Sequence, residues 1–263
     1  MSQSRLLWAG VKYPLPLMDE LFDRVVHAKY FSKLDLRTGF HQIRIHEDDV
    51  AKTAFRTRYG SFEYRVLPMG LCNAPGTFMQ LINDTFRDLP DRCVLVFLDD
   101  ILVYSNTLEE HVKHLRQVLE RLDSAKLYAK MSKCELAKSE VEFLGHHIGA
   151  NGLSTMQDKV SAVRDWPQPQ NVTDVRSFLG LAGFYRRFVN RYAEIALPLT
   201  ALTRTVTGEP FAWGQRESTA FAALKSAMTH APILLIADHS LPYTLDRDAC
   251  HYAIGATLQQ AQG

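Results

Sequence analysis

Two aspartates stand side by side between apolar stretches that are typical of buried β-strands. Residues 94–105 read VLVFLDDILVYS, in which Asp99 and Asp100 are the only charged side chains. Apolar β-branched and aromatic runs separated by two short polar residues predict a β-hairpin with an Asp-Asp turn. Two adjacent carboxylates beside buried strands repel each other unless a cation or a proton compensates. The pattern therefore indicates a divalent metal site, although a solvated turn explains these residues equally well on their own.

A third aspartate has a similar setting earlier in the chain. Asp35 lies between two leucines in the run FSKLDLRTGF, which predicts a strand that ends at a glycine turn. The side chain suits a third metal ligand, and it equally suits a cap of the following turn, because aspartate bonds readily to nearby backbone groups. The metal hypothesis predicts that Asp35 converges with Asp99 and Asp100.

Composition limits the class of protein. Lysine and arginine total 30 against 29 acidic residues, so any surface for nucleic acid must come from local arrangement and not from net charge. The four cysteines have no C-x-x-C spacing, and the N-terminus has no apolar signal region. We therefore expect an intracellular protein, cytoplasmic or nuclear. No run approaches the roughly 18 apolar residues of a membrane span, so we expect no membrane partner.

Short elements are expected on both sides of Asp35. Apolar residues at four-residue spacing predict a first helix, and they are Leu17, Leu21 and Val25. Two strands, 53–57 and 62–66, are expected to flank a turn at 58–61. We interpret Glu47 to Asp49 as a solvated turn because the surroundings are polar. The loop 67–76, LPMGLCNAPG, is rigid and suits close approach to a ligand before a helix begins.

A long helix is expected after the acidic hairpin. Thr107 to Glu110 form a capping box, and the apolar residues that follow at helical spacing are Leu108, Val112, Leu115, Leu119 and Leu122. His111 and His114 lie three residues apart, but no third ligand accompanies them, so we interpret them as part of a solvated face and not as a zinc site. Residues 141–147 are then expected to form a hairpin across the turn at 149–152.

The segment 172–192 predicts a helix with two different faces. Apolar residues gather on one side, and a second stripe gathers opposite: Arg176, Gly180, Gly183, Arg187 and Arg191. Glycines between arginines let a helix lie close to a phosphate backbone that the guanidinium groups neutralise. Glycine for helix packing with arginine for solubility is the alternative explanation of this arginine–glycine stripe. Residues 211–236 predict a helix and a short strand, and 243–250 and 252–258 predict two further strands.

Seven motifs in fixed order resemble the reverse transcriptases of gypsy-type long-terminal-repeat retrotransposons: LDLRTGFHQI, KTAF, LPMGLCNAPGTF, FLDDILVYS, EFLGH, RSFLGLAGFYRRF and LDRDA. The resemblance implies an α+β fold, with a polymerase palm of antiparallel sheet plus helices. Partial fingers and palm would occupy residues 1–153 and a helical thumb or connection 154–239. The first strands of a ribonuclease H-like α/β domain would occupy 240–263.

The resemblance also implies roles for individual residues. Asp35, Asp99 and Asp100 would be catalytic and would hold two Mg²⁺ ions. Leu36, Phe40, Met69 and Gly70 would contact the nucleotide, with Phe40 beneath its sugar. The template and primer would be contacted by Asn73, Pro75, Phe143, Leu144, Gly145 and the arginine–glycine stripe. Lys133 would assist departure of pyrophosphate, and Asp248 would be the first ribonuclease H aspartate. The partners would be a primer on an RNA or DNA template and deoxynucleoside triphosphates.

Two features depart from the family pattern. Only Met1 to Lys12 precede the YPLP segment, where the family carries basic fingers residues, and the ribonuclease H-like part stops after two strands. We therefore expect a piece truncated at both ends, with no ribonuclease H activity and at most weak polymerase activity. A non-catalytic remnant that only binds nucleic acid is the alternative. Another palm enzyme, such as a nucleotidyl cyclase, is disfavoured because the thumb and ribonuclease H sequences would have no role.

Overall fold

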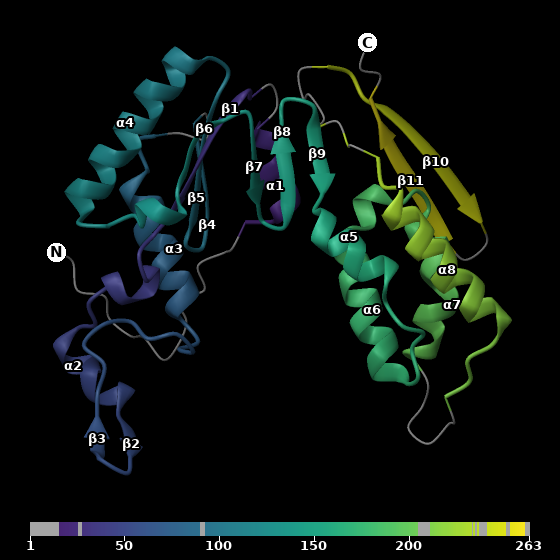
Figure 1. The fold of residues 1–263 in the computed structure, drawn as a ribbon, viewed down its shortest axis with the longest axis horizontal. Coiled ribbons are helices and arrows are strands. Elements are labelled where there is room, and N and C mark those ends of the chain that lie inside the picture. Colours follow the sequence, from purple (N-terminus) through teal and green to yellow (C-terminus); the bar gives the residue numbers. More distant parts are fainter. Residues whose placement is uncertain are drawn as a thin grey trace. The chain divides into compact units, whose positions relative to one another are not determined.

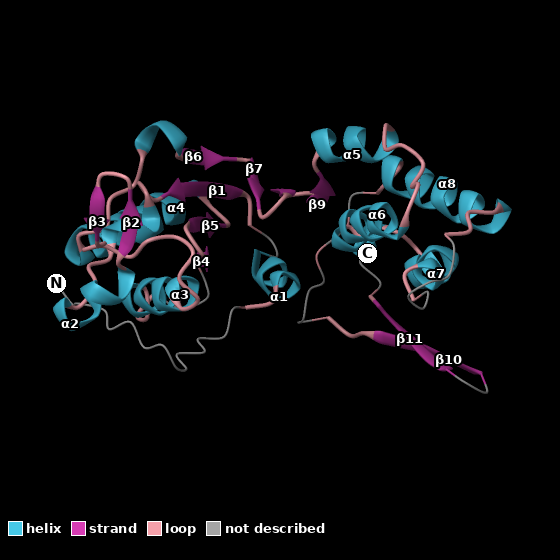
Figure 2. Cartoon of the chain, turned by 90° about the horizontal axis from the view of Figure 1, so that it is seen from below, coloured by secondary structure: helices cyan, strands magenta, loops and turns pink. Residues whose placement is uncertain are grey.

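The computed structural model describes residues 16–25, 28–89, 93–204, 211–232, 234, 236, 241–250 and 253–260. The chain separates into two compact units, one formed by residues 1–141 with 236–263 and the other by residues 142–235. Figure 1 labels the elements of both units, and Figure 2 shows their helices and strands in separate colours. Among the described residues, no helix has the length and apolar character needed to cross a membrane.

The first unit is built on a four-stranded sheet in the order β4-β5-β1-β6. Its strands are β1 (Tyr30–Asp35), β4 (Val94–Phe97), β5 (Asp100–Ser105) and β6 (Glu135–Lys138). β4 and β5 form the predicted antiparallel hairpin, and β5 pairs in turn with β1. Its helices and helical turns are α1 (Met18–Phe22), η1 (Asp23–Val25), η2 (Gly39–Gln42), α2 (Glu47–Val50), η3 (Ala51–Thr53), α3 (Ala74–Thr85), α4 (Leu108–Ala125) and η4 (Met131–Lys133).

Helices α3 and α4 cover one face of this sheet. Alternate residues of a strand point to opposite faces, so Leu34, Ile101 and Val103 share a face across the β1–β5 register. They join Phe78 of α3 and Val118 of α4 in one buried apolar cluster. Asp35 and Asp100 lie on the opposite face, away from these helices. The buried cluster therefore fixes the strands without occupying the side on which the acidic residues lie.

The orientation of α4 differs from the sequence expectation. Its N-terminus is as predicted, because Thr107 accepts a hydrogen bond from the Glu110 N–H. Leu108, Val112 and Leu119 are exposed, however, whereas His111, Val118 and Leu122 are buried. The apolar spacing thus predicted the helix correctly, but of the five predicted residues only Leu122 and, in part, Leu115 face the core. His111 is 1% exposed and not part of a solvated face.

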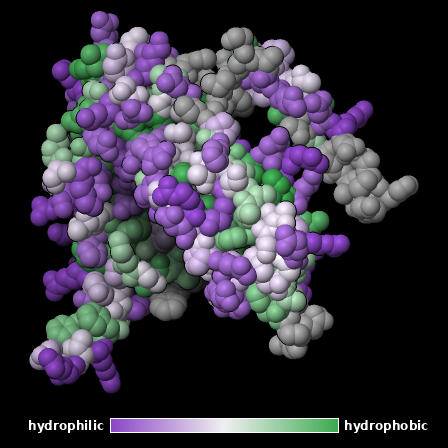
Figure 3. Space-filling view, turned by 45° about the vertical axis from the view of Figure 1, so that its right-hand side comes forward, coloured by the Kyte–Doolittle hydropathy of each residue, from purple (hydrophilic) through white to green (hydrophobic). Residues whose placement is uncertain are grey.

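A small hairpin precedes α3, formed by β2 (Phe55–Thr57) and β3 (Gly60–Phe62). Thr57 pairs with Gly60, so the loop contains only Arg58 and Tyr59 and is shorter than predicted. Exposed apolar side chains gather on this hairpin, and they include Phe55, Tyr59 and Phe62; Figure 3 shows this surface at its lower left. Upstream, Asp49 is not in a solvated turn: it lies in α2, is 5% exposed and pairs with Lys52.

The second unit combines a small sheet with helices. Strands β7 (Glu140–Phe143), β8 (His146–Gly149) and β9 (Gly152–Thr155) are adjacent in that order, and β8 pairs with β9 as the predicted hairpin. The helices and helical turn are α5 (Gln157–Arg164), α6 (Val172–Phe184), η5 (Arg186–Phe188), α7 (Tyr192–Leu202) and α8 (Gln215–Thr229). The expected single helix over 172–192 is therefore interrupted after Phe184, and Arg191 has a left-handed conformation, with φ of 54°.

The end of the described chain is a two-stranded antiparallel ribbon, as predicted. β10 (Thr244–Cys250) pairs with β11 (Ala253–Gln259), and Asp248 lies opposite Gly255. The side chain of Asp248, the expected ribonuclease H ligand, lies outside the described part of the structure.

Candidate active site

The fold brings the three candidate carboxylates to one end of the β1–β5 pair. Asp35 is the last residue of β1 and lies directly opposite Asp100, the first residue of β5. Directly opposed residues of an antiparallel pair have Cβ atoms about 4.5–5.5 Å apart. Asp99 precedes Asp100 in the hairpin turn, and Asp35 and Asp99 line the same pocket. Residues that are far apart in the sequence thus lie at the same end of one strand pair.

The turn between β4 and β5 differs by one residue from the predicted Asp-Asp turn. Phe97 pairs with Asp100, so the turn residues are Leu98 and Asp99. Leu98 has φ of 53°, a left-handed conformation that is unusual for leucine and costs of order 1–3 kcal/mol. Its N–H donates to the Met79 sulfur of α3. Because the turn begins one residue earlier than predicted, the two aspartates have different environments. Asp99 is exposed in the turn, and Asp100 belongs to the sheet.

Gly39 allows this turn to lie close to the end of β1. A Cβ atom at Gly39 would lie 3.2 Å from the Cβ of Asp99 and 3.3 Å from the Phe78 ring. Contacts at these distances are tighter than nine in ten real Cβ contacts, so a neighbour would have to shift by a few tenths of an ångström. Close packing therefore explains the glycine of the LDLRTGF motif, since a side chain at this position would displace Asp99.

Two lysines pair with the carboxylates. Lys33 Nζ lies 3.5 Å from Asp100 Oδ1, and Lys133 Nζ lies 3.3 Å from Asp35 Oδ2. Burial raises the pKa of Asp100. The ammonium group of Lys33 opposes this rise, and the negative charges of Asp99 and Asp35 add to it. Sequence reasoning missed Lys33. Its position two residues before Asp35, which places both side chains on one face of β1, was the available signal.

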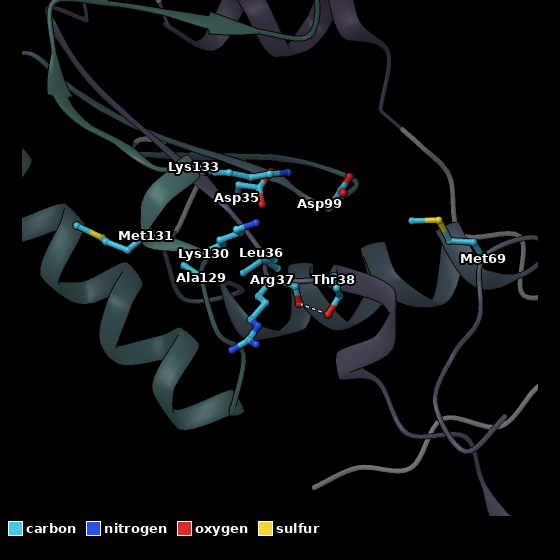
Figure 4. Close-up of a pocket in the computed structure, with 11 residues that line it drawn as sticks. Asp35, Leu36, Arg37, Thr38, Met69, Asp99, Ala129, Lys130, Met131 and Lys133 are labelled. Carbon is cyan, nitrogen blue, oxygen red and sulfur yellow. Dashed lines mark hydrogen bonds and ion pairs between the residues drawn. The ribbon is translucent and has the colours of Figure 1, made fainter.

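A pocket of about 580 Å³ opens beside these groups. Its lining contains Asp35 and Asp99 together with Arg37, Lys130 and Lys133. In Figure 4 the ammonium groups of Lys130 and Lys133 lie on the side that holds Asp35. Acidic and basic side chains thus meet in one cavity, which suits a ligand that carries phosphate groups as well as a bound cation. The sequence did not single out Arg37 or Lys130.

The donor set fits a hard divalent cation. Carboxylate oxygens are the protein ligands that Mg²⁺ prefers, and Asp35, Asp99 and Asp100 supply them. Within the described residues, no three acidic, histidine or cysteine side chains are already arranged around one ion position. Asp100 and Asp35 are instead paired with two different lysines, Lys33 and Lys133. Binding of a cation would exchange these partners for the ion.

The residues expected to contact the nucleotide differ in their position relative to the pocket. Met69 is 73% exposed and lines the pocket, and Gly70 has φ of 96°, which favours glycine. Leu36 lines the pocket too, but its side chain is 2% exposed in the core, so its contact with a ligand would come from the backbone. Phe40 is outside the pocket lining, and its ring centroid lies 5.0 Å from that of Phe78.

The loop that continues from Gly70 leads directly into α3. Asn73 is the N-cap residue of this helix, and Pro75 lies in its first turn. Proline is favoured there because the first helical N–H groups have no partner within the helix. The motif LPMGLCNAPG therefore sets the start of α3, whose Phe78 and Met79 support Gly39 and the acidic turn.

The EFLGH segment forms a tight loop that is held by aromatic residues of the second unit. Leu144 and Gly145 both have positive φ, and the Tyr185 hydroxyl donates to the Gly145 carbonyl oxygen at 2.8 Å. Burial raises the pKa of Tyr185 to about 12, so the hydroxyl keeps its proton. The His146 ring stacks on Phe184. Phe143 is 0% exposed, so its side chain supports the loop and does not reach a primer.

The arginine–glycine stripe is divided among three segments. Arg176, Gly180 and Gly183 lie on α6, Arg187 on η5, and Arg191 caps α7. The three arginines and Gly180 are exposed, and a Cβ atom at Gly180 would meet nothing within 4 Å. Helix packing within the described residues therefore does not require this glycine. Arg176 donates to the Thr203 carbonyl oxygen, and Arg191 pairs with Glu194, so both have protein partners to exchange for a phosphate.

Comparison with known proteins places this geometry in a family. Residues 4–148 match the family described as reverse transcriptase (RNA-dependent DNA polymerase). Residues 213–263 match the RNase H-like domain found in reverse transcriptase, so this match begins before α8. The first match covers more than half of the chain and contains every residue of the acidic site.

Relatives of known name are polyproteins of transposons. The chain is 39% identical over 249 residues to the retrovirus-related Pol polyprotein from transposon 297 of Drosophila melanogaster, covering 95% of this chain and 23% of the relative. It is 35% identical over 248 residues to the transposon Tf2-3 polyprotein of Schizosaccharomyces pombe, covering 94% of this chain and 18% of the relative. The chain thus spans about a quarter or less of these relatives.

Solved structures agree with this assignment. A foamy viral protease-reverse transcriptase in complex with double-stranded DNA is 27% identical, with a TM-score of 0.85 over 97% of this chain and 53% of that one. The same viral protein in complex with an RNA/DNA hybrid is 26% identical, with a TM-score of 0.82 over 95% of this chain and 36% of that one. The chain belongs to the reverse transcriptase family of RNA-dependent DNA polymerases.

Proposed function

We propose that this chain adds deoxynucleotides to the 3′ end of a primer as directed by an RNA or DNA template. The observation that carries the proposal is that Asp35, Asp99 and Asp100 lie at one end of the β1–β5 pair, with Asp35 and Asp99 in the lining of a pocket that also contains basic residues. Base pairing with the template selects the nucleotide, so the protein supplies position and charge. Lys130 and Lys133 are the basic residues whose ammonium groups a triphosphate would meet there.

Asp35, Asp99 and Asp100 would hold two Mg²⁺ ions, in accord with the use of divalent metal ions by the family. When bound, such ions favour ionisation of the primer 3′-hydroxyl and neutralise charge on the phosphates. Lys133 would hold a proton at Nζ for the departing pyrophosphate. Lys33, whose ammonium group lies 3.5 Å from Asp100 Oδ1, would release this carboxylate to the ions when they bind.

The partner that suits the remaining surfaces is a duplex of primer and template. The foamy viral relatives were solved with double-stranded DNA and with an RNA/DNA hybrid, which supports this class of partner. The loop that contains Asn73 and Pro75 would face the template, and Leu144 with Gly145 would face the primer. Phe40 would limit the space at the sugar, although its packing on Phe78 is equally typical of a core residue.

Extension of a labelled DNA primer on an RNA template tests the proposed function. We expect template-dependent incorporation of deoxynucleotides in the presence of Mg²⁺ and none after chelation with EDTA. The alternative, a remnant that only binds nucleic acid, would bind the duplex with a defined salt dependence and incorporate nothing. A chain that neither binds nor extends the duplex would contradict both.

The arginine–glycine stripe gives a prediction for binding. Each arginine that contacts a phosphate adds about one to the slope of log affinity against log salt concentration. The double variant Arg187→Ala, Arg191→Ala should therefore lower that slope by about two in titrations of a fluorescent duplex. Arg164→Ala is the matched control, because this exposed arginine lies on α5 outside the stripe. An equal slope in the double variant and the control would show that the stripe does not contact the duplex.

A further inference from the structure

A buried chain of hydrogen bonds lies on the helix-covered face of the palm sheet. His111 of α4 is 1% exposed, Ser32 of β1 is 0% exposed and Ser105 of β5 is 4% exposed. Ser32 Oγ lies 2.7 Å from His111 Nε2, and Ser105 Oγ lies 3.1 Å from His111 Nδ1. Ser105 Oγ also lies 2.8 Å from His114 Nδ1. We call these four side chains the Ser-His relay.

The backbone N–H of Ala137 favours one tautomer of His111. It donates to Ser32 Oγ at 2.9 Å, and among the relay contacts His111 Nε2 is the acceptor available to the Ser32 hydroxyl proton. A ring that accepts at Nε2 is neutral and carries its proton on Nδ1. In this tautomer His111 donates to Ser105, whose own proton can then be donated to His114 Nδ1. If Nε2 were protonated instead, the Ser32 proton would have no acceptor among the relay contacts, which is costly for a buried group.

The relay joins the strands that carry the acidic residues. Between Phe31 and Lys33, one residue of β1 lies opposite two residues of β6, which is a β-bulge. Ala137 in this bulge has φ of 48°, and its N–H bonds to the Ser32 side chain and not to the β1 backbone. Ser32 lies three residues before Asp35, about 10 Å along the strand. The relay thus fixes the relative positions of β5, β1 and β6 from the end of β5 that is far from Asp100, and a shift of these strands would reach the carboxylates through the strand register.

None of the described residues in contact with His111 carries a negative charge that would stabilise the protonated ring. The groups that face the ring are Tyr30 and Ser32 from β1, Ser105 from β5 and His114 from α4, while β6 contributes only the Ala137 N–H to the relay. No carboxylate within the described part of the chain lies within ion-pair distance of the ring. Burial lowers the pKa of His111, and the neighbouring His114 lowers it further.

We propose that Ser32, His111 and Ser105 are positioning residues for the carboxylates of the polymerase site, and that they hold the strands in place only while His111 is neutral. The role rests on the proposed function, because it concerns metal binding at that site. It also makes the palm sensitive to acid. A histidine with a lowered folded-state pKa takes up protons more readily when unfolded, so its contribution to stability is complete above pH of about 6.5. That contribution is lost as the pH falls toward the folded-state pKa.

Stability against pH tests the relay without any assay of activity. A glutamine side chain in place of the imidazole can accept from Ser32 and donate to Ser105 but does not titrate. His111→Gln should therefore remove part of the loss of thermal stability between pH 8 and pH 5.5. His230→Gln is the matched control, since His230 is exposed on the surface of the second unit, and it should leave the pH dependence unchanged. Identical acid-induced losses in wild type and His111→Gln would overturn the proposal.

Binding of Mn²⁺, followed by the electron paramagnetic resonance signal of the free ion, separates positioning from general support. Ser32→Ala should weaken Mn²⁺ binding at pH 8 by up to about tenfold, less than the loss of a group bonded directly to a metal ligand, because Ser32 acts only through the position of β1. Val118→Ala, which opens a cavity on the same face of α4, should lower thermal stability without this effect. Equal Mn²⁺ affinity in folded Ser32→Ala and wild type would overturn the positioning role.

The two proposals fail in different ways. If wild type bound no Mn²⁺ and extended no primer at pH 8, the proposed function would fail, whereas the stability measurements would still decide whether neutral His111 holds the strands. If Ser32→Ala did not fold, the Mn²⁺ affinity of His111→Gln would be measured at pH 8 and pH 6 in its place. A loss of affinity over this range that is smaller than in wild type supports the relay. An equal loss contradicts it.

Discussion

Asp99→Asn is expected to lower the rate of primer extension by on the order of 10³, which corresponds to about 4 kcal/mol of transition-state stabilisation. The amide keeps the size of the side chain but removes the negative charge that a divalent cation requires. Asp99 is the cleanest of the three carboxylates to change, because it is exposed in the turn, whereas Asp100 and Asp35 also pair with lysines. The fold should therefore persist.

Single-nucleotide incorporation under saturating primer–template measures this effect. Asp123→Asn is the control, because Asp123 is an exposed carboxylate on α4 outside the pocket lining, and it should retain the wild-type rate. Circular dichroism should show the same thermal transition for Asp99→Asn and wild type. A folded Asp99→Asn protein that extends primers at the wild-type rate would remove Asp99 from the metal site.

Gly145→Ala is expected to destabilise the second unit by about 2 kcal/mol and to reduce primer extension. Gly145 has φ of 74°, and a left-handed conformation costs an L-residue roughly 1–2 kcal/mol. A Cβ atom would also lie 3.2 Å from the Phe184 ring, which stacks on His146 and cannot move freely. The displaced loop would lose its bond from Tyr185 and its proposed contact with the primer.

Gly180→Ala is the matched comparison, measured like Gly145→Ala by denaturant unfolding and by duplex binding. Gly180 lies within α6 in open space, so alanine should stabilise the helix by up to about 1 kcal/mol. If the helix backbone approaches phosphates at this point, duplex binding should nevertheless weaken. The same sign of stability change in both glycine variants would contradict the distinct roles that the structure gives these residues.

The sequence determined the local elements and the family. Apolar runs around Asp99 and Asp100 predicted the hairpin, the capping box at Thr107 predicted the start of α4, and the order of motifs indicated a reverse transcriptase. These signals are local or depend on order, so a single sequence carries them. The occurrence of Asp35 in a strand was predictable for the same reason, while its position opposite Asp100 follows from strand register.

Only the tertiary structure decided which partners these elements have. The leucine spacing of α4 allowed either of two neighbouring faces of the helix to be buried. Packing on β1 and β5 buried the face with His111, because Ser32 and Ser105 form hydrogen bonds with its ring nitrogens. The pairs Lys33–Asp100 and Lys133–Asp35 likewise join separate strands and turns. The break after Phe184 accompanies the packing of Phe184, Tyr185 and Phe188 around His146, a contact between distant segments. Such choices depend on which polar groups find partners on burial, and helical or strand periodicity does not contain that information.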